Sequence, residues 1–174
     1  YKLRLIGSNI GLDRFYNDLD PVSAIEDLIE ISQPSKNEKI IFIWPEGILP
    51  GISQKQLIAG FSFDYVEMPH GPVTSTGFRF EADGKSIVYA TDFSEITPAM
   101  VRCFQRADIL VVDCLRRRPH PTHANLDMAL ELARKAKVRK TVLTHMDKSM
   151  DYRSLCSEVP GNVTVGYDGL EMAA

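Results

Sequence analysis

Short apolar segments of strand length alternate along the chain with segments whose apolar residues recur at helical spacing. Phe61, Phe63 and Tyr65 alternate with polar residues, as in a half-buried strand. Residues 125–137 place their apolar side chains on one helical face. The predicted strands are 3–6, 40–44, one from 61 to an end within 68–71, 76–80, 86–90, 109–112, 141–144 and 163–165. The predicted helices are 21–31, 98–107, 125–137 and a short one near 152. This alternation predicts a layered α/β fold.

Turn and capping residues mark several boundaries between these elements. Asp83-Gly84 predicts a hairpin turn, and Thr97-Pro98 predicts a helix start with Thr97 as N-cap. The stretch 49–60 contains Pro50, Gly51 and Gly60, so it is either a simple loop or a junction. We predict two parts, residues 1–55 and 56–174.

Composition excludes several classes of protein. The 174 residues are 44% hydrophobic and 25% charged, with a net charge of −3, so no global basic field favours nucleic acid. Three cysteines without zinc-type spacing favour neither a zinc ribbon nor a disulfide framework, and a reducing, cytoplasmic setting is expected. No apolar run approaches the roughly 20 residues that span a bilayer, and the first residues lack a secretory signal pattern.

Polar residues follow the ends of several predicted strands. Such positions build the active sites of α/β proteins, because loops at the carboxyl ends of strands meet there. Each of these residues could instead cap the following turn or helix. The five residues are Glu46, His70, Asp92, Asp113 and His145.

Histidine and aspartate at these ends favour a metal site. His70, Asp92 and His145 could converge on one point with the donor types that zinc, manganese or iron accept. A carboxylate can bridge two ions about 4 Å apart, which together clamp the oxygens of a phosphoester displacement. His120 and His123 would lie on a loop beside that point and bind phosphate or donate a proton. Alternatively, both are exposed loop residues between prolines.

Residues 61–172 resemble the C-terminal half of metallo-β-lactamase-fold hydrolases, in particular the phosphonate-pathway cyclic phosphodiesterases. The segments that carry the resemblance stand in family order and are MPHGPVTSTGFRF, IVYATDFSEI, ADILVVDCLRRRPHPTHANL, VLTHMD and YDGLEM. The resemblance implies part of a layered αββα sandwich, preceded here by a strand–helix–strand unit. It also implies a small phosphodiester substrate and a divalent metal, zinc or manganese, which is dinuclear in the intact family.

The same resemblance implies roles for single residues. His70 would be a metal ligand, Asp92 the bridging carboxylate and His145 a ligand of the second ion. His123 would be the active-site histidine beside the substrate phosphate, with His120 also on the substrate side. Asp113 would orient a ligand from outside the coordination sphere.

The chain departs from this family in one respect. The main metal motif, H-x-H-x-D-H, is absent from the 174 residues, and all four histidines already have other implied roles. Three implied ligands are too few for a complete two-metal site. An inactive hydrolase is therefore one version of the prediction, and a dimer that shares ligands across an interface is another.

The first third resembles a fragment of the nitrilase-like domain of apolipoprotein N-acyltransferase, through LRLIGSNIG and IIFIWPEGILPG. That resemblance makes Glu46, in W-P-E, the general base for a cysteine nucleophile helped by a lysine. No segment after Gly51 resembles the cysteine or lysine segments, so Glu46 is predicted to be a remnant or a turn cap. Three functions stay open: a metal-dependent phosphodiester hydrolase, a fused or truncated product without catalysis, and an acyltransferase-related fragment.

Overall fold

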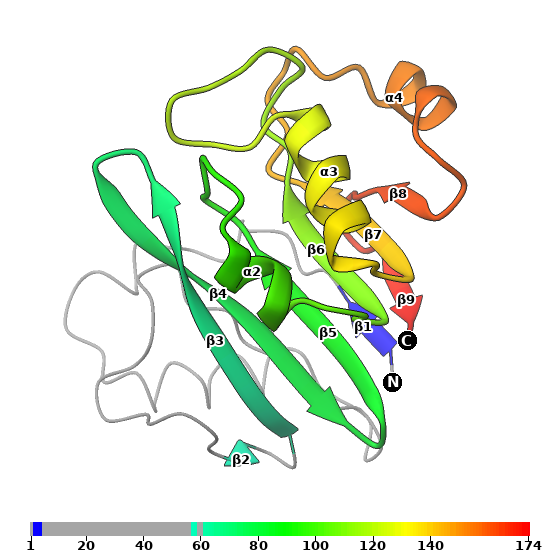
Figure 1. Ribbon diagram of the computed structural model, residues 1–174. Helices are drawn as coiled ribbons and strands as arrows, with labels where there is room; N and C mark the ends of the chain where they lie inside the picture. The colour runs from blue at the N-terminus through cyan, green and yellow to red at the C-terminus, as the bar shows by residue number, and fades with distance from the viewer. Residues whose placement is uncertain (1, 5–56, 59–60) are drawn as a thin grey trace, which may run out of the picture. The chain divides into compact units, whose positions relative to one another are not determined.

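The computed structural model describes residues 2–4, 57–58 and 61–174 (Figure 1). The chain divides into two compact units, Tyr1–Pro45 with Tyr167–Ala173, and Glu46–Gly166 with Ala174. In the first unit, β1 (Lys2–Arg4) pairs antiparallel with β9 (Glu171–Ala173). The predicted helix 21–31, the predicted strand 40–44, Glu46 and the boundary between 55 and 56 lie outside the described residues and stay predictions.

The second unit contains a seven-stranded mixed sheet with the strand order β2-β3-β4-β5-β6-β7-β8. Strands β2 to β5 pair antiparallel, and β5 to β8 pair parallel. The strands are β2 (Leu57–Ile58), β3 (Phe61–His70), β4 (Val73–Ala82), β5 (Lys85–Ala90), β6 (Ile109–Asp113), β7 (Lys140–Thr144) and β8 (Val163–Val165). The predicted hairpin about Asp83-Gly84 is confirmed, since β4 and β5 flank those two residues.

The direction of the strands determines where their ends meet. Strand β4 runs antiparallel to both β3 and β5, so β3 points the same way as β5, β6 and β7. The carboxyl ends of these four strands therefore lie along one edge of the sheet. The residues that the sequence predicts at strand ends, His70, Asp92, Asp113 and His145, lie at that edge.

Three helices are described in the second unit, and local side chains explain where they begin. They are α2 (Pro98–Cys103), α3 (Leu126–Ala136) and α4 (Tyr152–Glu158). The Thr97 hydroxyl accepts a hydrogen bond from the N–H of Met100, which confirms the predicted cap. None of the described helices is long and apolar enough to cross a membrane.

Helix α2 ends earlier than the sequence predicts. We expected it to reach Ala107, but it ends at Cys103. The N–H of Arg106, at φ 56°, donates to the carbonyl of Ala136 on α3 at 2.7 Å. A tertiary hydrogen bond therefore replaces the helical one, which local sequence cannot reveal.

The core lies between the sheet and helices α2 and α3, which Figure 1 shows in front of the sheet. Val88, Leu110 and Phe104 are fully buried there. Gly77 on β4 permits this packing, because a Cβ atom at that position would lie 2.6 Å from Cζ of Phe104 and 2.8 Å from Sδ of Met68. The predicted α/β class is confirmed for the described residues, in which strands β2 to β8 form one mixed sheet.

Candidate metal centre

Imidazole and carboxylate side chains gather at the carboxyl edge of the sheet. His70 is the last residue of β3, and Asp113 is the last residue of β6. Asp92 follows β5 by two residues, and His145 follows β7 directly. His123 comes from the loop of residues 114–125, between β6 and α3. Five residues far apart in sequence thus approach one another because four parallel-running strands end together.

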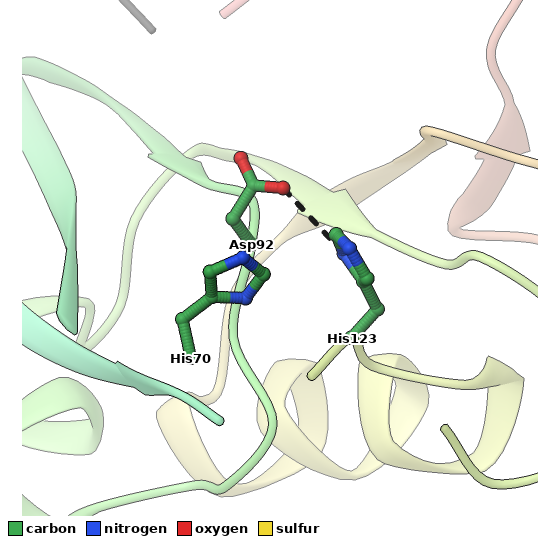
Figure 2. Close-up of side chains that lie close together, drawn as sticks. All are labelled: His70, Asp92 and His123. Carbon is green, nitrogen blue, oxygen red and sulfur yellow. Dashed lines mark ion pairs between the residues drawn. The ribbon is translucent and has the colours of Figure 1, made fainter. Parts of the chain in front are cut away.

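These side chains form two groups that could each hold a metal ion. In the first, His70, Asp92 and His123 offer one ligand atom each, and these atoms lie within 4.8 Å of one another. Figure 2 shows these three side chains pointing toward one another from three different segments. In the second group, Asp113, His123 and His145 meet the same criterion. His123 belongs to both groups.

The predicted ligands therefore lie near one another, but they are divided between the two groups in a way that the sequence did not predict. Neither group contains His70, Asp92 and His145 together. The ring of His123 contacts the rings of both His70 and His145, with its centroid 4.8 Å from that of His70 and 4.9 Å from that of His145. The sequence predicts His123 beside the metal but does not predict that it belongs to both groups, because the conformation of a loop leaves no periodic pattern in the sequence.

His120 stands at the margin of the cluster. Its ring centroid is 5.2 Å from that of His123, and it belongs to neither group. Its Nδ1 atom accepts a hydrogen bond from the N–H of Thr122 at 3.3 Å. Partial burial and the nearby charge of Arg116 lower the pKa of His120, which favours its neutral form.

Asp113 connects two members of the cluster from a buried position. Its side chain has no solvent exposure, and its Oδ2 atom lies 3.0 Å from Nδ1 of His123 and accepts from the N–H of Asp92 at 3.1 Å. Among the residues that the structure describes, its Oδ1 atom has no hydrogen-bond partner. Burial raises the pKa of the Asp113 carboxyl, and His123 and His145 offset this only in part. Burying a carboxylate with an oxygen that lacks a hydrogen-bond partner costs folding free energy unless a cation or a proton binds that oxygen.

A backbone carbonyl orients the ring of His70. The Nδ1 atom of His70 lies 2.7 Å from the carbonyl oxygen of Thr122. A carbonyl only accepts, so Nδ1 carries the hydrogen and the lone pair of Nε2 remains for an ion. Gly71, at φ +61°, allows this approach, because a Cβ atom there would lie 2.5 Å from Cγ2 of Thr122.

The backbone at two of the strand ends is in an unusual conformation. Asp92 has φ 61° and His145 has φ 60°, both in the left-handed region that costs a non-glycine residue roughly 1–2 kcal/mol. Hydrogen bonds hold Asp92 there, since its carbonyl accepts from the hydroxyl of Ser75 at 2.7 Å. Such strain concentrates at functional sites.

The donor set suits a divalent transition metal. Imidazole nitrogens and carboxylate oxygens are ligands of zinc and manganese, and the rings of His70 and His123 are both fixed through one nitrogen. The unpartnered Oδ1 of Asp113 adds negative charge beside them. The described residues therefore fit a metal ion.

Two of the three cysteines do not suit the acyltransferase prediction. Burial raises the pKa of Cys103 to about 11 and that of Cys114 to about 12, whereas a nucleophilic cysteine needs a lowered pKa. Glu46 lies outside the described residues. Neither the family model that this chain matches nor three solved structures that it resembles, a PhnP-family diphosphatase, YhfI and PqqB, is described as a nitrilase-like or acyltransferase protein.

Several solved structures are similar to this chain, and one of them is described as a metallo-β-lactamase fold protein. A diphosphatase from the PhnP family is 32% identical, over 70% of this chain and 46% of that chain, with a TM-score of 0.63. YhfI from Bacillus subtilis is 20% identical, over 84% and 61%, with a TM-score of 0.61. Zinc-bound PqqB from Methylobacterium extorquens is 17% identical, over 67% and 52%, with a TM-score of 0.55. The last two show the fold alone.

This chain spans less than two thirds of each of these three relatives. No curated protein matches it. The family model described as the beta-lactamase superfamily domain matches residues 49–146, which is more than half of the chain. The match includes His70, Asp92, Asp113 and His145. The chain belongs to the metallo-β-lactamase superfamily and carries part of its mixed α/β fold.

Proposed function

We propose that this chain belongs to a metal-dependent hydrolase of small phosphodiesters. One observation carries the proposal: three histidines and two aspartates, from four strand ends and one loop, meet at the carboxyl edge of the sheet. The 32% identity to a protein described as a diphosphatase supports a phosphoester substrate.

In this proposal His70, Asp92 and His145 supply ligands to the ion, and zinc or manganese is the expected metal. When bound, the ion supplies Lewis acidity toward a phosphoryl oxygen. The side chain of Asp92 is 39% exposed, so its carboxylate can reach an ion while its backbone stays held by Asp113 and Ser75. A second ion would share this carboxylate.

His123 and His120 are placed on the substrate side. Asp113 holds Nδ1 of His123, so the ring keeps one orientation and presents its other nitrogen to a phosphate or a leaving oxygen. His120, with its lowered pKa, is suited to a hydrogen bond with phosphate rather than to a fixed positive charge. The absence of H-x-H-x-D-H from the sequence favours the competing proposal of a non-catalytic chain.

Metal-dependent hydrolysis of bis(p-nitrophenyl) phosphate separates the two proposals. We expect release of p-nitrophenol by protein loaded with Zn²⁺ or Mn²⁺, loss of release after chelation, and loss in Asp92→Asn. Asp64→Asn, an exposed carboxylate on β3 outside both groups, is the matched control and should keep the activity. Absence of turnover in the metal-loaded protein would favour the non-catalytic proposal, and turnover retained in Asp92→Asn would identify a contaminant.

A further inference from the structure

We propose that His123 is itself a metal ligand in this chain and completes a one-ion site with His70 and Asp92. The inference rests on the proposed function because it concerns the same ion, and it changes which imidazole is the third ligand. Its starting point is the first of the two groups, in which ligand atoms of these three residues lie within 4.8 Å of one another (Figure 2).

Hydrogen bonds prepare the rings of His70 and His123 in the same way. Nδ1 of His70 is held by the carbonyl of Thr122 at 2.7 Å, and Nδ1 of His123 by the carboxylate of Asp113 at 3.0 Å. Both partners accept a hydrogen, so each ring keeps one nitrogen with a free lone pair. Metal-ligating histidines have this arrangement, because the second nitrogen donates to a carboxylate or a backbone carbonyl.

His145 lacks this preparation. Among the described residues, the structure gives no hydrogen bond to either ring nitrogen of His145, and the residue is exposed. Its ring stacks on that of His123, with centroids 4.9 Å apart and an angle of 23° between the planes. The side chain of His123 is 17% exposed, and the edge-on contact with the ring of His70 has a centroid distance of 4.8 Å. A half-buried, hydrogen-bonded imidazole loses less conformational freedom on binding an ion than an exposed one.

Asp92 completes the set with a carboxylate beside the His123 ring. The ligand atoms that Asp92, His70 and His123 offer lie within 4.8 Å of one another. Two imidazoles and one carboxylate are a ligand set of catalytic zinc sites, which use three protein ligands. The four histidines of the chain cannot also supply the ligands of the missing H-x-H-x-D-H motif, and His123 is the ring that already lies among the other ligands.

This assignment limits what His123 can do during hydrolysis. A ring that binds an ion through one nitrogen and Asp113 through the other has no proton to give to a leaving oxygen. An acidic leaving group such as p-nitrophenol departs as its anion and needs no proton donor. Diesters with such leaving groups should therefore be the better substrates. Alkyl diesters, which need a proton donor, should react much more slowly.

Zinc affinity, measured by competition with a chromophoric chelator, tests the assignment in three alanine variants. We expect His123→Ala to weaken zinc binding by about 100-fold or more, beyond what loss of an outer partner usually costs. His145→Ala should weaken it by less than about 10-fold, and His120→Ala, the loop control outside both groups, should bind like the unchanged protein. The visible spectrum of bound Co²⁺ should change in His123→Ala and stay the same in His120→Ala.

His123→Cys provides a rescue that does not depend on how well the alanine variant folds. A thiolate can replace the imidazole as ligand, so this variant should regain zinc binding and show sulfur-to-cobalt charge transfer. Zinc binding unchanged in His123→Ala and lost in His145→Ala would overturn the inference and leave the proposed function standing. Zinc binding that depends on His123, without hydrolysis of any diester, would support the inference and overturn the proposed function.

Discussion

The two ends of strand β6 each carry a buried or nearly buried aspartate, and the two aspartates are treated differently. At the amino end, the carboxylate of Asp108 accepts from the N–H of Ser86 at 3.0 Å, from its hydroxyl at 3.3 Å and from Arg139 at 2.8 Å. At the carboxyl end, one oxygen of Asp113 contacts His123 and the N–H of Asp92, and the other has no hydrogen-bond partner within the described part of the chain. Both carboxylate oxygens of Asp108 therefore have hydrogen-bond partners within the protein, whereas one oxygen of Asp113 remains available to a ligand.

The charges around the two carboxyls show the same contrast. Burial alone would raise the pKa of Asp108, but the hydrogen bond from Ser86 and the charges of Lys85 and Arg139 outweigh it and lower the pKa. Burial is the dominant influence on Asp113 and raises its pKa. Ionic groups that are fully paired support the fold, whereas a buried group with a spare acceptor marks a place for a cation or proton. The comparison predicts that substitutions at the amino end change stability and those at the carboxyl end change metal binding.

The largest effect is expected for His70→Ala at the carboxyl end. Loss of one of three ligands should weaken zinc binding by about 100-fold or more. The free energy of unfolding should fall by only about 1 kcal/mol, the usual worth of one hydrogen bond, here the one to Thr122. Chelator competition and urea unfolding measure the two quantities. A large loss of stability with unchanged zinc affinity would contradict the proposal that the carboxyl end of the strands serves metal binding and not stability.

Asp108→Ala is the counterpart at the amino end. Loss of its hydrogen bonds and of its ion pair with Arg139 should lower the free energy of unfolding by about 2 kcal/mol at pH 7. Zinc affinity should not change.

The pH dependence of this loss has a definite sign. The pKa of Asp108 is lower in the folded chain than its ordinary value of 3.8. Its stabilising effect is therefore fully present above that value and disappears as the pH falls through the lower, folded pKa. The difference in unfolding free energy between the unchanged protein and Asp108→Ala should be constant from pH 5 to 7 and shrink in more acidic urea titrations. A difference that grows on acidification would contradict this explanation.

Asp113→Asn should have a moderate effect on the metal and little effect on the fold. An amide keeps the size of the carboxyl but removes its negative charge from beside His123. We expect zinc affinity to fall by about 10-fold, as for loss of an outer partner of a ligating histidine. Stability should change by less than about 1 kcal/mol, because a neutral amide is easier to bury than a carboxylate. Unfolding that is markedly easier would show that Asp113 resembles Asp108 after all.

The smallest expected effect comes from relieving the left-handed backbone. His145→Gly should raise the free energy of unfolding by up to about 1 kcal/mol, because glycine adopts φ 60° without strain. Arg106→Gly is the matched control near the amino end, with φ 56° and an exposed side chain. Both variants should gain similar stability in thermal unfolding. A loss of stability in His145→Gly alone would mean that its ring supports the fold.

Local features of the sequence predicted most of the described fold. The Asp83-Gly84 turn, the Thr97 cap and the apolar strand 109–112 depend on neighbouring residues, so pattern and capping rules suffice for them. The end of α2 was missed because the carbonyl of Ala136, distant in sequence, terminates it.

The site was predicted in part for a related reason. His70, Asp92, Asp113 and His145 follow strands, and strand direction brings them to one edge whatever the loops do. The position of His123 depends on the conformation of the loop 114–125. The partner of His70 is the backbone carbonyl of Thr122, and a backbone contact cannot be predicted from the type of residue that makes it. The hydrogen bonds of Asp108 were also missed, because the donors, Ser86 and Arg139, are distant from it in sequence.

The metal content of the purified chain tests the central claim most directly. Elemental analysis after dialysis against Zn²⁺ and then against metal-free buffer gives the ratio of metal to protein, for the unchanged chain and for Asp92→Asn. We predict close to one zinc ion per chain in the unchanged protein and almost none in the variant. No retained zinc, or equal amounts in the two proteins, would contradict a metal centre built from His70, Asp92 and their neighbours at the carboxyl edge of the sheet.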